Sequence, residues 1–318
     1  MTYPWISLSP KGSVSFVNKF PRTKDFRISW RLILAAMLCV ILSSLIGLVP
    51  SLSQKPCFVS FLGEITILAA IVPGMAYLLG RRRLHDVGIR SFPAKLLPFI
   101  ILLPIAAQPF INIVTLPANT LLDRIFGVGK IPLDVPGTLP EWFFAIGAIC
   151  IAAPVLEELL CRGVIMALLK EYGLITSLSV SALGFALLHF SPSTFVVIFF
   201  LGLMFGVIRL ATDSLSACII AHAANNLAAF LLEVVPGLSE SINIPMLLLC
   251  IAAFPALLYF FLVLSPRENR CLVQYNPSRA ASFSVCRIIC FSLYGGYALI
   301  LFIMNVSELL TGAPYILS

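Results

Sequence analysis

The chain has 318 residues, of which 60% are hydrophobic and only 11% are charged, and its mean hydropathy is +1.03. Soluble domains carry roughly 25% charged residues, so this composition excludes a water-soluble globular protein. The net charge of +7 fits basic residues collected in the cytoplasmic loops of a membrane protein, and we expect no nucleic-acid partner.

The apolar stretches are continuous rather than alternating, which excludes a transmembrane β-barrel and predicts an all-α, polytopic transmembrane bundle. Runs bounded by charge, Pro or Gly predict about eight or nine spans. In chain order they cover residues 32–50, 57–79, 96–117, 142–169, 175–190, 194–210, 215–232, 245–265 and 287–307. The run at 175–190 is the weakest, because it is short and contains three serines.

The basic residues predict the orientation of these spans. With the N-terminus in the cytoplasm, 17 Lys and Arg residues fall in inner segments and 3 in outer ones. Because cytoplasmic loops are enriched in Lys and Arg, this asymmetry favours nine spans, a cytoplasmic N-terminus and an outer C-terminus.

The spans divide the chain into five predicted parts, and no signal peptide is expected at the start. They are a basic cytoplasmic N-terminal segment, a three-helix membrane leader, an outer loop rich in Gly and Pro, a membrane core and a C-terminal two-helix segment, at residues 1–31, 32–117, 118–141, 142–232 and 233–318.

A few polar side chains lie inside these spans, where ionisable groups are costly and indicate function. The 142–169 run contains Glu157, Glu158 and Arg162. The next run contains His189, and the 215–232 run contains His222 and Asn226. A carboxylate, two imidazoles and an amide in neighbouring helices are more than packing requires. Glu64 also lies in a span, and there we favour a hydrogen bond between helices.

Helical spacing assigns these groups to different faces. Glu158 and Arg162 are four residues apart, so they lie on one face and predict an ion pair that braces the helix. Adjacent Glu157 points about 100° away and is left to meet another partner. By the same spacing, Phe185 packs beside His189 and limits its rotamers.

Helix rise also predicts which groups share a depth. Glu157 and His189 lie sixteen residues on either side of Gly173, where the chain is expected to turn. At roughly 1.5 Å per residue the two side chains reach a similar height and face each other. His222 fits this depth less well, because it lies nine residues past Asp213, the nearest charge on the inner side.

Three patterns on successive predicted helices carry a resemblance to a known family. They are Glu157-Glu158-x-x-x-Arg162, Phe185-x-x-x-His189 and His222-x-x-x-Asn226. In this order they resemble the CPBP family of intramembrane proteases, which includes the type II C-a-a-X prenyl proteases and the Abi proteins of bacteriocin self-immunity. The resemblance covers about residues 140–232 and includes no departure at a motif position.

The resemblance implies hydrolysis of a peptide bond in a membrane-associated substrate of the C-a-a-X or leader-peptide type. It implies that Glu157 activates water with the help of His189, while His222 and Asn226 stabilise the oxyanion. Glu158, Arg162 and Phe185 would support them. Glu157, His189 and His222 are also a possible zinc ligand set. We favour metal-independent water activation, because H-E-x-x-H is absent and three separate helices would supply the ligands.

Two other functions stay open at this point. One is a non-catalytic immunity or scaffold protein of the same fold. The other is a proton-coupled transporter that uses Glu64, Glu157 and the histidines, although no inverted repeat is evident. Membrane lipids and a peptide or protein substrate are the expected partners. The compact loops favour a bacterial plasma membrane.

Overall fold

The structure is a computed structural model in which residues 55–84, 87–126, 135–169, 174–189, 191–192, 194–238 and 244–265 are described, together with short pieces near the N-terminus. These pieces are 6–8, 14–16, 31, 34–36 and 38–39. The first two form an antiparallel hairpin of β1 (Ile6–Leu8) and β2 (Val14–Phe16). Helices make up most of the other described residues, which confirms the all-α class for the apolar segments that the structure describes.

Six helices in the described part of the chain are long and apolar enough to cross a membrane. They comprise α2 (Pro56–Leu84), α3 (Leu97–Phe126), preceded by the short turn η2 (Ala94–Leu96), a composite helix over 139–169, α8 (Phe195–Thr212), α9 (Leu215–Val234) and α10 (Ile244–Leu264). The predicted spans at these places are therefore confirmed as helices. Of the 32–50 span only a few helical residues are described, and the 287–307 span lies outside the described residues.

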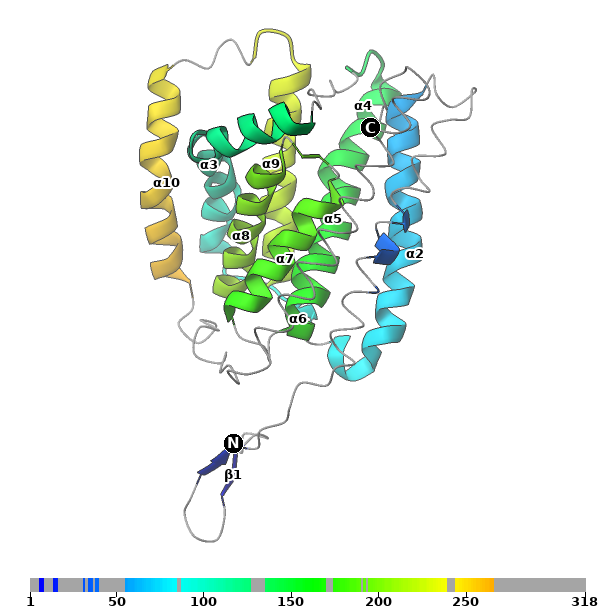
Figure 1. Ribbon diagram of the computed structural model, residues 1–318, viewed down its shortest axis with the longest axis vertical. Helices are drawn as coiled ribbons and strands as arrows, with labels where there is room; N and C mark the ends of the chain where they lie inside the picture. Colours follow the sequence, from blue (N-terminus) through cyan, green and yellow to red (C-terminus); the bar gives the residue numbers. More distant parts are fainter. Residues whose placement is uncertain are drawn as a thin grey trace.

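The run predicted as the weakest span, 175–190, is the helix α7 (Leu174–Leu188), whose 15 residues leave it shorter than the six long helices. One detail of the prediction needs correction. The predicted outer loop at 118–141 is largely helical at its start, because α3 continues to Phe126 although it contains three prolines. Proline breaks one backbone hydrogen bond and bends a helix without having to end it. In Figure 1 the C-terminal part of α3 turns across one end of the bundle.

The composite helix contains two π-helical segments. It consists of α4 (Leu139–Ile146), the π-helical η3 (Gly147–Ala152), α5 (Ala153–Glu158), the π-helical η4 (Leu159–Ile165) and α6 (Met166–Leu169). A π turn widens the helix and often marks a functional site. Both turns flank α5, which holds the two adjacent glutamates.

Two serines of α7 donate hydrogen bonds to backbone carbonyls in η4 and just after it. The hydroxyl of Ser181 donates to the carbonyl oxygen of Cys161 at 2.9 Å, and that of Ser177 donates to Met166 at 3.1 Å. A serine in the predicted span thus satisfies backbone groups instead of facing lipid unpaired. On its other side α7 packs closely on α8, where a Cβ on Gly202 would lie 3.0 Å from the Cα of Ala182.

The remaining helices enclose this pair. In Figure 1, α2 and α10 stand at opposite edges of the bundle, with α5, α7, α8 and α9 between them. Helix α2 packs on α4, η3 and α5, whereas α3 packs on α8, α9 and α10. One large hydrophobic cluster joins these helices, with Leu160, Ile165 and Phe205 among its fully buried members.

A polar clamp holds the segment before α3 against the turn between α8 and α9. Asp213 forms ion pairs with Arg90 and, at 2.7 Å, with Arg209. The backbone N–H of Leu215 donates to the carbonyl of Gly88 at 2.8 Å. Gly88 has φ +79°, and a Cβ there would collide with the guanidinium of Arg209. This position therefore requires glycine for both conformation and space.

Candidate active site

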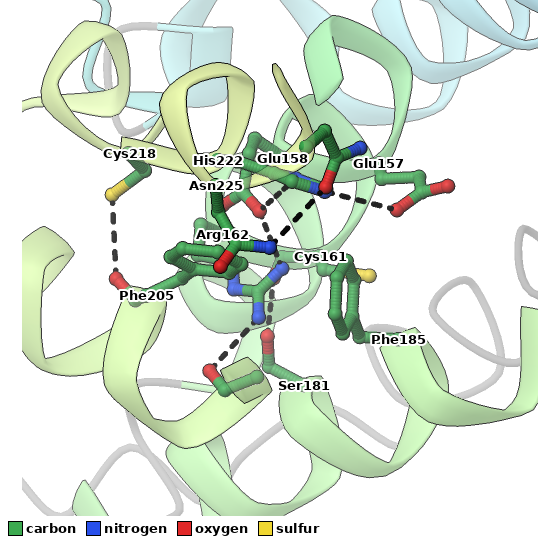
Figure 2. A network of polar contacts seen from close by, with 12 residues as sticks. Glu157, Glu158, Cys161, Arg162, Ser181, Phe185, Phe205, Cys218, His222 and Asn225 are labelled. Atoms are coloured by element: carbon green, nitrogen blue, oxygen red, sulfur yellow. Dashed lines mark hydrogen bonds and ion pairs between the residues drawn. The ribbon is translucent and has the colours of Figure 1, made fainter. Parts of the chain in front are cut away.

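The predicted polar residues converge where α5, η4, the end of α7 and α9 meet. Figure 2 shows Glu157, Glu158, Arg162, His222 and Asn225 gathered at this centre. Because the helices come from distant parts of the sequence, the packing of the bundle creates the cluster. The structure thus brings together most of the residues that the three motifs indicate.

Glu158 and Arg162 form the buried ion pair predicted from their spacing. Nη1 of Arg162 donates to Oε1 of Glu158 at 2.8 Å, and both side chains are 0% exposed. Nη2 of Arg162 donates to the carbonyl of Gly202 at 2.8 Å, which ties η4 to α8. The guanidinium lies 4.3 Å from the ring centroid of Phe185 and 5.5 Å from that of Phe205. These contacts offset the cost of removing the positive charge from water.

Glu158 does more than brace its own helix. Its Oε1 also lies 3.0 Å from Nδ1 of His222. Since a carboxylate only accepts hydrogen bonds, Nδ1 of His222 carries the hydrogen and Nε2 is the nitrogen turned toward other groups. The sequence prediction treated Glu158 as an ion-pair partner alone, because helical spacing says nothing about which residue of α9 lies opposite.

His189 is held in the same tautomer by a backbone group. Its Nδ1 lies 2.9 Å from the carbonyl oxygen of Phe185, one turn earlier, and must donate to it. This contact leaves Nε2 of neutral His189 with a lone pair. The ring of Phe185 packs edge-on against His189, with centroids 4.9 Å apart, as the four-residue spacing predicted. It also packs against His222 at 5.3 Å.

Glu157 is the point on which both histidines converge. Its Oε2 lies 3.9 Å from Nε2 of His189 and 3.9 Å from Nε2 of His222. The depth prediction for Glu157 and His189 is therefore confirmed, and His222, which fitted the depth less well, reaches the same carboxylate. The same Oε2 is buried and has no hydrogen-bond partner.

These distances are too long for direct hydrogen bonds. At 3.9 Å from each Nε2, Oε2 of Glu157 bonds directly to neither histidine, so a group that bridges all three atoms would have to supply the hydrogens. The side chains of His189 and Glu157 are 30% and 17% exposed, whereas that of His222 is 3% exposed. The cluster is therefore more open on the side of His189 and Glu157 than on the side of His222.

Asn226 lies beside this centre, and its contacts differ from those expected. Its Nδ2 donates to the carbonyl oxygen of Ile149 in η3 at 3.0 Å. Its neighbour Asn225 is 5% exposed and accepts a hydrogen bond from Nε2 of Gln108 in α3 at 3.0 Å. The sequence prediction did not include Asn225 and Gln108 among the site residues. Both are polar amides inside predicted membrane spans, and this unusual position could have indicated them.

Phe205 was also missed, because an aromatic residue in an apolar run has no distinguishing signal. Its ring stacks on His222 with centroids 4.8 Å apart and an interplanar angle of 23°.

Glu64 lies on α2, half-buried and near enough to Glu157 for an electrostatic interaction. The hydrogen bond predicted for Glu64 between helices stays a prediction.

The zinc alternative stays a prediction. Among the residues that the structure describes, no group of three His, Cys, Asp or Glu side chains forms a ready-made metal site. The chemistry below is derived from the side chains and water.

An apolar cleft lies along the composite helix that also holds Glu157. It has a volume of about 460 Å³ and lies between α2, which contributes Phe61, Ile65 and Leu68, and the composite helix from Phe143 to Val155. Val155 is two residues before Glu157, a spacing that points the two side chains to different sides of the helix. The cleft could hold an apolar part of a ligand.

Comparison with known proteins supports the class indicated by the motifs. Residues 139–228 match the family described as Type II CAAX prenyl endopeptidase Rce1-like. Over this part the chain is similar to that family of membrane proteases, as the motifs indicate. With its apolar helices, the chain is that of an integral membrane protein. The comparisons found no matching curated protein and no matching solved structure.

Proposed function

We propose that this protein is an intramembrane endopeptidase in which Glu157 activates the attacking water. The observation that carries the proposal is the position of Oε2 of Glu157, 3.9 Å from Nε2 of both His189 and His222 and without a hydrogen bond of its own. Three acceptor atoms turned toward one space need a donor between them, and a water molecule supplies two O–H groups.

The chemistry follows from these roles. The oxygen of the water attacks the carbonyl carbon of the scissile bond while Glu157 takes a proton from the water. Nε2 of His189 accepts a hydrogen bond from the water and holds it in place. The tetrahedral intermediate then collapses, and the proton on Glu157 passes to the leaving amine. The products are a new carboxyl terminus and a new amino terminus, so the water is fully consumed.

The oxyanion needs donors that lie beside the water. Asn226 keeps one N–H beyond its bond to Ile149, because a side-chain amide has two. Nε2 of His222 is an acceptor while the ring is neutral, so a role of His222 at the oxyanion requires an imidazolium with hydrogen on both nitrogens. Glu158 lies at Nδ1 to pair with that charge. One such donor contributes about 3 kcal/mol to transition-state stabilisation.

The proposed substrate is a membrane-associated peptide or protein of the CAAX or leader-peptide type. The apolar cleft beside Val155 supports a substrate with an apolar part, and membrane lipids are the other partners. We further propose nine spans with a cytoplasmic N-terminus in a bacterial plasma membrane, on the basis of the distribution of Lys and Arg and the compact loops.

The test is a comparison of cleaved membrane and secreted peptides in cells that carry wild-type protein or Glu157→Gln. Loss of a general base costs about 10²–10⁴-fold in rate, so peptides produced by the enzyme should disappear in the variant. Glu233→Gln is the matched control, because Glu233 is exposed on α9 away from the cluster. Its peptides should equal those of the wild type.

The same strains separate the other functions. An immunity or scaffold protein would keep its phenotype in Glu157→Gln and show no product that depends on Glu157. A transporter would lose proton-coupled uptake without any change in cleaved peptides. Either result would overturn the peptidase proposal.

A further inference from the structure

A chain of side-chain amides crosses the bundle behind the candidate active site. Gln108 of α3 donates through Nε2 to Oδ1 of Asn225 at 3.0 Å. Asn225 donates through Nδ2 to Oδ1 of Asn226 at 3.4 Å. Asn226 donates through Nδ2 to the carbonyl oxygen of Ile149 at 3.0 Å. Every bond runs in the same direction, from α3 through α9 to η3.

The end of this chain is determined by a proline. In η3 the backbone N–H of Ala153 donates to Ala148, five residues earlier. The next donor in this register would be residue 154, which is Pro154 and has no N–H. The carbonyl of Ile149 therefore lacks its π-helical donor, and Nδ2 of Asn226 supplies the hydrogen instead.

The two ends of the chain set the orientation of the middle amide. Asn225 is 5% exposed, so each of its polar atoms needs a partner. Because the carbonyl of Ile149 only accepts, Asn226 must present Nδ2 to it and its oxygen to Asn225. Asn225 must then donate through Nδ2 to Asn226 and turn its own oxygen toward the N–H of Gln108. A chain of bonds in one direction also polarises each amide in turn, which strengthens the last donor.

We propose that Gln108 and Asn225 are positioning residues that fix the amide of Asn226 with Nδ2 as the donor at the active site. The inference rests on the proposed function, in which the second N–H of Asn226 binds the oxyanion. Neither residue belongs to the three sequence patterns. Their role is to decide which end of the Asn226 amide faces the reacting carbonyl.

The experiment compares two replacements at position 108 in the full-length protein. Gln108→Glu replaces the donor with an acceptor, so Asn225 must rotate and present its oxygen to Asn226. The amide of Asn226 must then rotate too, which turns its oxygen toward the carbonyl oxygen of Ile149 and breaks that bond. Gln108→Met removes the donor but leaves Asn225 in place. We expect kcat to fall about 100-fold in Gln108→Glu and less than about 10-fold in Gln108→Met, with KM unchanged in both.

Thermal stability gives a second readout. Gln108→Glu keeps a hydrogen bond to Asn225 after the rotation but leaves the carbonyl of Ile149 without its donor, whereas Gln108→Met leaves the oxygen of Asn225 unpaired. Each variant leaves one acceptor unpaired, so both should lose similar Tm. If Gln108 were only a structural link between α3 and α9, kcat would follow stability and the two variants would be equally active. Equal kcat would overturn the inference. Thr115→Val, which removes another buried hydrogen bond in α3, controls for general loosening of this helix.

A second measurement does not depend on hydrolysis. In protein with ¹⁵N-labelled asparagine, the side-chain amide signal of Asn226 is identified by its loss in Asn226→Asp. Gln108→Glu should shift this signal although residues 108 and 226 are not bonded to each other. An unchanged signal would overturn the inference even in an active enzyme. If wild type and Glu157→Gln cleave equally, the proposed function fails, and this signal still decides whether the chain positions Asn226.

Discussion

The buried ion pair of Glu158 and Arg162 yields the sharpest prediction for stability. Arg162→Met removes the bond to Glu158 at 2.8 Å, the bond to Gly202 at 2.8 Å and the contact with the ring of Phe185. Because both charged side chains are 0% exposed, the carboxylate of Glu158 is then buried without its cation. Breaking such a pair costs about 3–5 kcal/mol of unfolding free energy.

Removing both charges should cost less than removing one. In the double variant Glu158→Gln/Arg162→Met no unpaired charge stays in the interior. The amide oxygen introduced at position 158 can still accept from Nδ1 of His222, which lies 3.0 Å from Oε1 of Glu158 in the wild type. We expect the double variant to recover about 2 kcal/mol relative to Arg162→Met.

The assay is unfolding of the purified protein in detergent, followed by denaturant and by temperature. Arg162→Lys serves as a second variant if Arg162→Met does not fold, since it keeps the charge but loses the two-pronged contact with Glu158 and Gly202. A double variant that is no more stable than Arg162→Met would refute the reasoning, because the penalty would then not arise from an uncompensated charge.

Further predictions concern the clamp, the helix contacts and the chemistry. Gly88→Ala should lower Tm by more than Gly237→Ala. Both glycines have positive φ, but only at Gly88 would a Cβ collide with Arg209. Equal losses of Tm would contradict this reasoning. Ser181→Ala should lower the unfolding free energy by about 0.5–1.5 kcal/mol, because the carbonyl of Cys161 loses one donor and keeps the backbone N–H of Met166; no loss would mean that another group replaces the hydroxyl. His189→Ala should lower kcat by about 10²-fold or more with normal folding by circular dichroism, and wild-type kcat would count against its role. Peptide cleavage should survive exhaustive chelation with no zinc in elemental analysis, and activity restored by added zinc would refute water activation by side chains alone.

Much of the site could be predicted from the sequence because its residues are polar groups in apolar runs. Helical spacing correctly paired Glu158 with Arg162 and Phe185 with His189, since both pairs lie on one helix. Helix rise placed Glu157 level with His189 across a hairpin. These relations depend on local geometry, which an α-helix repeats with little variation.

Contacts between helices were not predictable in the same way. The bond from His222 to Glu158, the stacking of Phe205 on His222 and the link from Gln108 to Asn225 join residues far apart in the sequence. Which face of α9 meets α5 and which meets α3 depends on how the whole bundle packs. The predicted span ends also missed the last turns of α3, because composition alone does not show that a helix continues past three prolines.

The sequence by itself determined that the chain is an apolar helical protein. It also placed a carboxylate, two imidazoles and an amide inside apolar spans, where polar groups are costly to bury. Only the tertiary structure decided that these groups share one centre, that the ring nitrogens facing Glu157 are both Nε2, and that Asn226 is turned toward η3. The reason is physical: burial preferences and helical periods are properties of single segments, whereas tautomers and amide orientations depend on the partners that neighbouring helices bring.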